Sequence, residues 1–204
     1  MSGQDDRAME MRRLVCDTAV SMAHLGLATG SSGNVSVRFQ GRMMITASGI
    51  PYGSIRPEQV IEIDSDGARL SGEGEPSSEW RMHAAIYAQR GDIEAIVHTH
   101  SLYATAAAIA LPALPIPHDE GQIFYGKAVP VSVHHPPGSW DLAHAVADAL
   151  DCGRLVLIAK HGAVAVGATL GDALGSAVKL EEIAQLAYLA QQFSTHAPKQ
   201  EVGP

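Results

Sequence analysis

The octapeptide Glu94–Ser101, EAIVHTHS, joins an apolar run to two histidines that are separated by one residue. The apolar run, which begins at Ile93, is typical of a buried strand. Residues i and i+2 of a strand point to the same side, with Cα atoms about 6–7 Å apart. His98 and His100 therefore project side by side, close enough for both rings to bind one metal ion, while Thr99 points the other way.

A second apolar run, LVLIAK at residues 155–160, also ends in a histidine, and Gly162 beside it allows backbone or substrate to approach closely. Ligand sites of α/β proteins gather at the ends of buried strands, and a catalytic zinc site combines three protein ligands with one open position. His98, His100 and His161 are therefore candidate metal ligands. Chance proximity is the alternative, because the chain has 10 histidines. The others are expected on the surface or in the core: His24, His83, His118, His134, His135, His144 and His196.

Three loops of small residues form a second candidate site: GSSGN at residues 30–34, TASG at 46–49 and PSSE at 76–79. Each offers hydroxyls and backbone N–H groups, and the third opens a predicted helix, whose N-terminus attracts anions. Together these loops could hold a phosphate without a basic residue, although each could also be a simple turn. Glu79 lies in the first turn of that helix, where it could cap the helix or serve a metal site as ligand or general base.

Composition narrows the class of protein. The chain has 204 residues, 46% of them hydrophobic and 18% charged, which is typical of one globular domain. A net charge of −8 without any Lys/Arg cluster argues against nucleic acid and anionic membranes as partners. The most apolar region, residues 103–117, contains three prolines and is too short to span a bilayer. With a polar N-terminus and two cysteines, Cys16 and Cys152, that do not indicate a disulfide framework, a cytoplasmic location is expected.

The rest of the chain alternates short strands and helices. Strands are predicted at residues 35–39, 43–47, 60–64, 93–97, 129–134, 155–160 and 163–166. Helices are predicted at about residues 7–27, 77–90, from 101 onward, 138–151 and 171–192. Because neighbouring short strands need hairpin pairing, this order favours an α/β sandwich with a largely antiparallel sheet over a doubly wound parallel sheet.

Five motifs occur together between Gly30 and Gly167: SSGNVSVR, ITASGIPYG, PSSEWRMHAAIY, IVHTHS and KHGAVAVG. In their order and spacing they resemble the class II aldolase/adducin family. The resemblance implies a three-layer αβα sandwich with a central, mostly antiparallel sheet, formed by a single domain over residues 1–204. A tail from about residue 194 is expected to be flexible or docked on a neighbouring subunit. The resemblance also implies a cyclic homotetramer with active sites at subunit interfaces.

The same resemblance assigns roles to the candidate residues. His98, His100 and His161 match the zinc-binding histidines, although Mn²⁺ or Co²⁺ could also bind such a set. Glu79 matches the catalytic carboxylate, which can also ligate zinc. Six residues match positions that hold the phosphate of a sugar substrate: Gly33, Asn34, Ser48, Gly49, Ser77 and Ser78.

The implied reaction is cleavage of a ketose 1-phosphate, such as L-fuculose 1-phosphate, to dihydroxyacetone phosphate and an aldehyde. Zinc would act as a Lewis acid that stabilises an enediolate, and Glu79 would remove the proton that generates it. The aldehyde oxygen needs a proton donor, and here the chain departs from the family pattern. Asp119 stands where a catalytic Tyr is expected, so Asp119 or Tyr125 would have to donate that proton.

Other functions remain open on the same fold. A metal-dependent decarboxylase, epimerase or dehydratase of a sugar or sugar-acid phosphate would use similar chemistry. Epimerase relatives carry Asp at the position of Glu79, which disfavours that reading. A non-catalytic adducin-like binding module would be marked by loss of the metal histidines or the glutamate, and this chain keeps all four.

Overall fold

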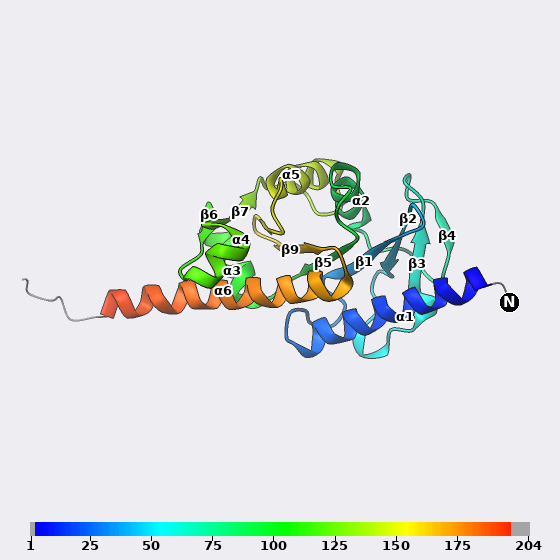
Figure 1. The fold of residues 1–204 in the computed structure, drawn as a ribbon, viewed down its shortest axis with the longest axis horizontal. Coiled ribbons are helices and arrows are strands. Elements are labelled where there is room, and N and C mark those ends of the chain that lie inside the picture. Colours follow the sequence, from blue (N-terminus) through cyan, green and yellow to red (C-terminus); the bar gives the residue numbers. More distant parts are fainter. Residues whose placement is uncertain (1–2, 197–204) are drawn as a thin grey trace, which may run out of the picture.

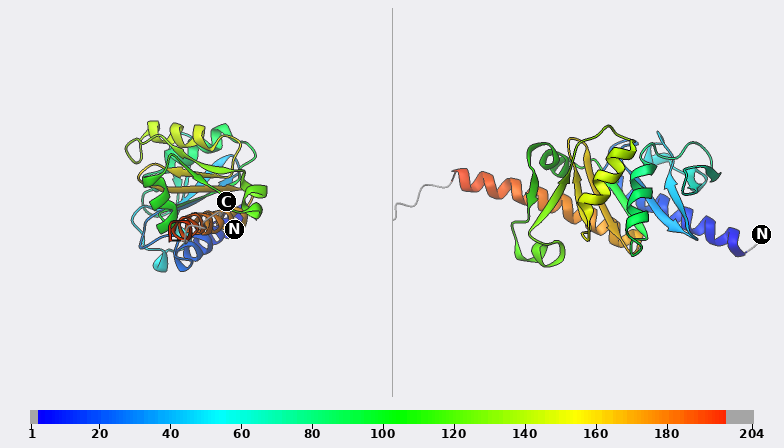
Figure 2. Two further views of the ribbon diagram at one scale, coloured as in Figure 1. Left: turned by 90° about the vertical axis from the view of Figure 1, so that its left-hand side faces the viewer. Right: turned by 90° about the horizontal axis from the view of Figure 1, so that it is seen from above.

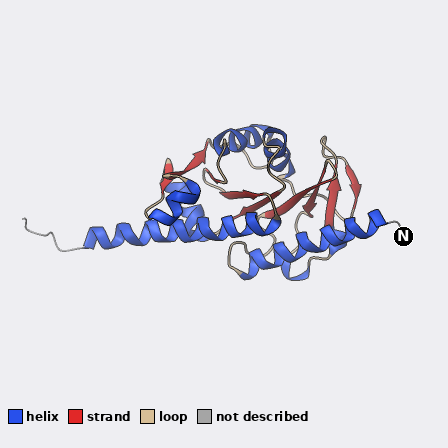
Figure 3. Ribbon diagram, viewed as in Figure 1, coloured by secondary structure: helices blue, strands red, loops and turns tan. Residues whose placement is uncertain are grey.

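The computed structural model describes residues 3–196 and shows a central sheet between two layers of helices (Figures 1 and 3). The strands are β1 (Asn34–Phe39), β2 (Arg42–Thr46), β3 (Val60–Ile63), β4 (Arg69–Ser71), β5 (Ala95–Thr99), β6 (Ala113–Pro115), β7 (Ala128–Ser132), β8 (Leu155–Ile158) and β9 (Gly162–Gly167). The helices are α1 (Gly3–His24), α2 (Trp80–Gln89), α3 (Leu102–Ala110), α4 (Asp119–Tyr125), α5 (Trp140–Leu150) and α6 (Leu170–His196), with short 3₁₀ turns η1 (Tyr52–Ser54) and η2 (Pro57–Gln59).

The sheet has the strand order β4-β3-β2-β1-β5-β9-β8-β7-β6. Among these described strands β7 and β8 pair in parallel, and every other neighbouring pair is antiparallel. The predicted, largely antiparallel sheet is therefore confirmed. The two strands that the sequence pattern missed, β4 and β6, are three residues long and lie at the two edges of the sheet.

The two faces of the sheet pack against different helices, which gives the predicted three-layer sandwich (Figure 2). Two neighbouring residues of β5 show which helices cover each face, because neighbouring residues of a strand point to opposite faces of the sheet. Ile96 packs with α2 and α5, whereas Val97 packs with α1, α3 and α6. Both side chains are fully buried, as expected for the middle strand of a sheet covered on both sides.

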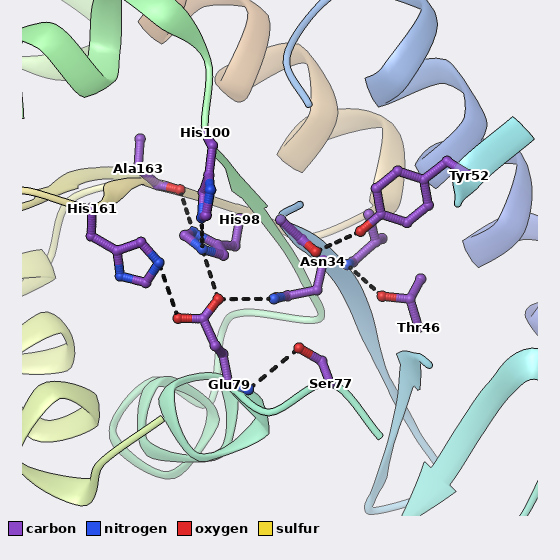
Figure 4. A network of polar contacts seen from close by, with 11 residues as sticks. Asn34, Thr46, Tyr52, Ser77, Glu79, His98, His100, His161 and Ala163 are labelled. Atoms are coloured by element: carbon purple, nitrogen blue, oxygen red, sulfur yellow. Dashed lines mark hydrogen bonds and ion pairs between the residues drawn. The ribbon is translucent and has the colours of Figure 1, made fainter. Parts of the chain in front are cut away.

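The register of the central strands brings predicted site residues to one end of the sheet. Strand β5 lies between β1 and β9, with Asn34 opposite His98 and Thr99 opposite Ala163. Three segments therefore meet at the same end of the central strands: His98 near the end of β5, Asn34 at the start of β1, and the turn before β9. The helix α2 begins close to these strand ends, so that Glu79 can approach His98 and His161 (Figure 4).

The structure also describes the two cysteines and the end of the last helix. Both cysteines are free, Cys16 buried in α1 and Cys152 exposed after α5. The helix α6 continues to His196, so the first three residues of the expected tail are helical, and residues 197–204 lie outside the described part of the chain. Within residues 3–196, the structure contains no helix that combines the length and apolarity required to cross a membrane.

Candidate metal centre

Four predicted residues converge at one end of the central strands: Glu79, His98, His100 and His161 (Figure 4). One nitrogen or oxygen atom from each side chain lies within 4.8 Å of the corresponding atoms of the others. The Nε2 atom of His98 is 2.9 Å from Glu79 Oε2 and 3.0 Å from Nε2 of His100. The Nε2 atom of His161 is 3.3 Å from Glu79 Oε1. Three imidazoles and one carboxylate thus direct their ligand atoms at one small volume.

Strand β5 and its neighbour fix the orientation of His98. The ring is fully buried, and its Nδ1–H donates a hydrogen bond of 2.9 Å to the carbonyl oxygen of Ala163 on β9. A carbonyl oxygen can only accept, so Nδ1 carries a proton and Nε2 faces the cluster. Such a bond behind a ligating histidine is a common feature of metal sites, because it sets the tautomer and the ring orientation.

A close backbone approach brings His161 to the other two histidines. The turn between β8 and β9 carries Lys160 at φ 61, and Gly162 follows His161 directly. A Cβ atom on Gly162 would lie 2.3 Å from the carbonyl oxygen of Thr99 and 2.9 Å from the His100 ring. Glycine is therefore required for this turn to reach the end of β5, as its position beside His161 suggested.

Glu79 occupies the N-cap position of α2, but its side chain makes no capping hydrogen bond. A capping hydrogen bond therefore does not explain this carboxylate, although the dipole of α2 favours its charge at this position. Its Oε2 accepts a hydrogen bond of 3.2 Å from the side-chain amide of Asn34, and its buried Oε1 has no hydrogen-bond partner among the described residues. Burial opposes ionisation of Glu79, but the charge and hydrogen bond of His98, helped by His161, outweigh burial and hold its pKa well below the usual range.

Burial and neighbouring charges shift the pKa values of the three histidines in different directions. Burial, with the positive potential of His98 and His161, lowers the pKa of His100 to about 4. Burial and His98 likewise lower the pKa of His161. Burial also disfavours a charged His98, but the attraction and hydrogen bond of Glu79 raise its pKa by more. An ionised carboxylate and the neutral rings of His100 and His161 are donors for a divalent cation, whereas binding through Nε2 of His98 requires loss of the proton that Glu79 stabilises.

A cleft of about 250 Å³ opens beside Glu79, His100 and His161, whereas His98 lies buried beneath them. It includes all six residues predicted to hold a phosphate. The cleft is lined by Ser31, Ser32, Gly33, Asn34, Ala47, Ser48, Gly49, Ser77, Ser78, Glu79, His100, Pro137 and His161. No Lys or Arg of the described chain lines it. Its polar character comes from hydroxyls, the Asn34 amide and backbone groups near the N-terminus of α2.

Hydrogen bonds tie the loop before β1 and the start of that strand to η1 and β2. The hydroxyl of Tyr52 donates a hydrogen bond of 2.5 Å to the carbonyl oxygen of Gly33, and the backbone N–H of Val35 donates one of 3.3 Å to the Thr46 hydroxyl (Figure 4). Tyr52 is buried in η1. Thr46 belongs to the predicted loop TASG, whereas Tyr52 was not singled out from the sequence, although it lies in the motif ITASGIPYG.

Asp119 and Tyr125, the candidate proton donors, do not line the cleft within one chain. They begin and end α4, which packs against β7, and β9 and β8 separate β7 from β5 in the sheet. Asp119 is exposed, whereas Tyr125 packs partly against the core. The structure therefore brings together the metal and phosphate candidates, but not the candidate acid.

A buried polar cluster that the sequence did not predict lies one helical turn beyond Glu79. His83 is fully buried, with Nδ1 2.6 Å from the hydroxyl of Ser36, which is 2.8 Å from the hydroxyl of Tyr87. Burial lowers the pKa of His83 to about 3, so it is neutral. Sequence reasoning placed His83 on the surface or in the core, and its partner Ser36 lies 47 residues away on β1.

Comparison with known proteins agrees with this geometry. Residues 13–188 match the family model of the Class II Aldolase and Adducin N-terminal domain, and the chain belongs to this family. It is 38% identical over 177 residues to an L-fuculose phosphate aldolase of Escherichia coli O6:H1, a match that covers 87% of this chain and 82% of the relative. These findings confirm the prediction of an enzyme of the class II aldolase family.

Two further relatives point to the same class. A 5-methylthioribulose-1-phosphate/5-deoxyribulose-1-phosphate aldolase of Rhodospirillum rubrum is 35% identical over 175 residues, covering 86% of this chain and 79% of the relative. A solved structure named L-fuculose 1-phosphate aldolase superimposes with a TM-score of 0.86 at 32% identity, covering 95% of this chain and 89% of that one.

Proposed function

We propose that this protein is a zinc-dependent aldolase that cleaves a ketose 1-phosphate, of the L-fuculose 1-phosphate type, to dihydroxyacetone phosphate and an aldehyde. The observation that carries the proposal is the convergence of three histidines and an ionised glutamate beside a hydroxyl-lined cleft. The relatives named as aldolases of phosphorylated ketoses support the reaction class.

The cleft suits the phosphate end of such a substrate. Ser48, Ser77 and Ser78 supply hydroxyl donors, and Asn34 supplies an amide. Residues 77–79 lead directly into α2, whose dipole favours an anion at this end. These short-range donors can take the place of a basic side chain.

His98, His100 and His161 would hold the cation, with Glu79 as a fourth ligand when no substrate is bound. Zinc is the proposed metal, and Mn²⁺ or Co²⁺ also accepts nitrogen and oxygen donors. When bound, the metal would supply Lewis acidity that polarises the carbonyl and hydroxyl oxygens of the substrate.

Glu79 is the proposed general base. It is ionised, 8% exposed and held by Asn34, so its carboxylate is available without a large change of conformation. In the condensation direction Glu79 takes a proton from the carbon next to the carbonyl of dihydroxyacetone phosphate. That carbon then bonds to the aldehyde carbon, and the aldehyde oxygen takes a proton from an acid. In cleavage the same steps run in reverse, so Glu79 returns the proton to carbon.

We assign the acid to Asp119 of a second copy of the chain, within a homotetramer whose active sites lie between subunits. Asp119 is exposed at the start of α4, which favours it over the partly buried Tyr125. Large apolar side chains beside it, Ile123 and Phe124, are exposed, as is Phe193 on the part of α6 that extends past the sheet (Figure 1). Exposed apolar surface of this kind supports assembly.

The test is release of dihydroxyacetone phosphate from L-fuculose 1-phosphate and 5-deoxyribulose 1-phosphate, with zinc and then with a chelator. We expect chelator-sensitive release, and Asp119→Asn should slow it by about 10²-fold or more, as for loss of a general acid. A zinc-loaded protein that releases no dihydroxyacetone phosphate would contradict the aldolase proposal. Decarboxylation, epimerisation and dehydration would then be assayed with the same protein.

A further inference from the structure

A carboxylate far along the chain caps the helix that follows the metal histidines. The two oxygens of Glu181, on α6, accept hydrogen bonds of 2.8 Å from the backbone N–H groups of Tyr103 and Ala104. These are the second and third residues of α3, where helical N–H groups have no partner within the helix. Glu181 therefore ties the start of α3 to a helix almost 80 residues further along the sequence.

The residue at the N-cap of α3 would normally accept a hydrogen bond from one of these N–H groups, but here it does not. Ser101 occupies the N-cap position of α3 with extended backbone angles, φ −65 and ψ 148, but its hydroxyl makes no capping bond. Serine at this position usually accepts the N–H of the second or third helical residue. Here the hydroxyl is buried without a hydrogen-bond partner in the described part of the chain, because Glu181 takes both N–H groups.

The carboxylate of Glu181 interacts with the start of α3 and not with a cationic side chain of the described residues. Within residues 3–196 no cationic side chain forms an ion pair with it, whereas the adjacent Glu182 pairs with Lys179 at 2.7 Å. The negative charge of Glu181 is instead placed at the N-terminus of α3, where the helix dipole favours it. Glu181 and Glu182 thus form a matched pair: neighbouring glutamates, of which one caps α3 and the other makes a surface ion pair.

The backbone that Glu181 fixes leads directly to His100. The pairing of β5 with β9 ends at Thr99, so His100 lies between the last paired residue of the strand and the N-cap of α3. The ring of His98 is oriented by the carbonyl of Ala163. Among the described residues, by contrast, the one hydrogen bond of the His100 ring is the contact to His98 within the cluster itself. No outer partner orients His100, so its position depends on the two ends of this short connection.

We propose that Glu181 is a positioning residue of the metal centre: by anchoring the first turn of α3 it holds His100 where its Nε2 meets those of the other ligands. The inference rests on the proposed metal centre and extends it to a residue on α6 that does not touch the cluster. Glu181 then takes, through the backbone, the part that the Ala163 carbonyl takes for His98.

The experiment is titration of the metal-free protein with Co²⁺, whose visible absorption reports the number and geometry of its ligands. Four proteins are compared: the wild type, Glu181→Ala, Glu181→Gln and the control Glu182→Ala. We expect Glu181→Ala to bind Co²⁺ on the order of 10-fold more weakly and with an altered spectrum, as when an outer partner of a ligand is lost. Glu181→Gln keeps one acceptor oxygen and should fall between, while Glu182→Ala should match the wild type.

Unfolding in urea and circular dichroism separate this role from a purely structural one. We expect Glu181→Ala to fold, because the Ser101 hydroxyl is placed to take over one of the two N–H groups. If it does not fold, Glu181→Gln decides the question by the same titration. A folded variant at Glu181 that keeps the affinity and the spectrum of the wild type would overturn the inference, even if its stability falls. A wild type that binds no Co²⁺ would overturn the metal centre itself, which is a distinct result.

Discussion

We expect Gly33→Ala to destabilise the protein far more than Gly30→Ala, although both glycines lie in the same loop before β1. Both have positive φ angles, 74 and 63, where an L-residue costs about 1–2 kcal/mol. Their surroundings differ. A Cβ atom on Gly33 would lie 2.4 Å from the carbonyl oxygen of His98, whereas one on Gly30 meets nothing within 4 Å in the described chain.

The clash between a Cβ atom at position 33 and the His98 carbonyl oxygen determines how far the two variants differ in stability. Forcing an extra methyl group into a packed region costs about 1–3 kcal/mol, so Gly33→Ala should lose about 2–5 kcal/mol of unfolding free energy and Gly30→Ala about 1–2 kcal/mol. The restriction of the unfolded chain by alanine is the same in both variants and cancels in the comparison. Because the displaced carbonyl belongs to His98, Gly33→Ala should also weaken metal binding.

Urea unfolding of the metal-free proteins gives both free energies from the same linear extrapolation. If the two variants lose the same stability within the uncertainty of the extrapolation, the close approach of Gly33 to β5 carries no strain. That result would contradict the expected clash between the Cβ atom added in Gly33→Ala and the His98 carbonyl oxygen.

Three further outcomes follow from the site. His100→Ala should lower bound metal well below one ion per chain by elemental analysis while the circular dichroism spectrum is kept, and full occupancy would remove His100 from the ligand set. Glu79→Gln should retain metal but slow exchange of the substrate C–H proton by about 10²-fold or more, and unchanged exchange would assign the base elsewhere. The unfolding free energy of the metal-free protein should fall as the pH is lowered from about 6.5 toward 4, because unfolded His83 takes up a proton that the buried ring, with its pKa lowered to about 3, does not. In His83→Gln this dependence should be weaker, and an identical pH profile would contradict it.

The parts of the fold and site that the sequence predicts are those with a local signal. The apolar run before His98 and the neighbouring strands predicted at residues 35–39 and 43–47 are visible in a few consecutive residues. The strands at the sheet edges carry no such signal. Strand β4 reads RLS and β6 reads ALP, and three residues are too few to show a period of two.

Side-chain partners from distant segments could not be predicted, because they depend on how the layers pack. The helix predicted at residues 77–90 starts only at Trp80, with Glu79 at the N-cap, which leaves Ser77 and Ser78 lining the cleft. Ser36 meets His83 only after α2 lies across β1, and the cap of α3 by Glu181 requires α6 to cross α3. Neither contact has a counterpart in local residue spacing.

The absence of Lys and Arg from the cleft lining in the described chain has a kinetic consequence. With a net charge of −8, the chain as a whole repels an approaching phosphate ester, and attraction begins only within reach of the hydroxyls and the α2 dipole. Added salt screens the long-range repulsion more than these short-range contacts. The rate of substrate capture should therefore rise with ionic strength, opposite to enzymes that draw anions into a basic cleft.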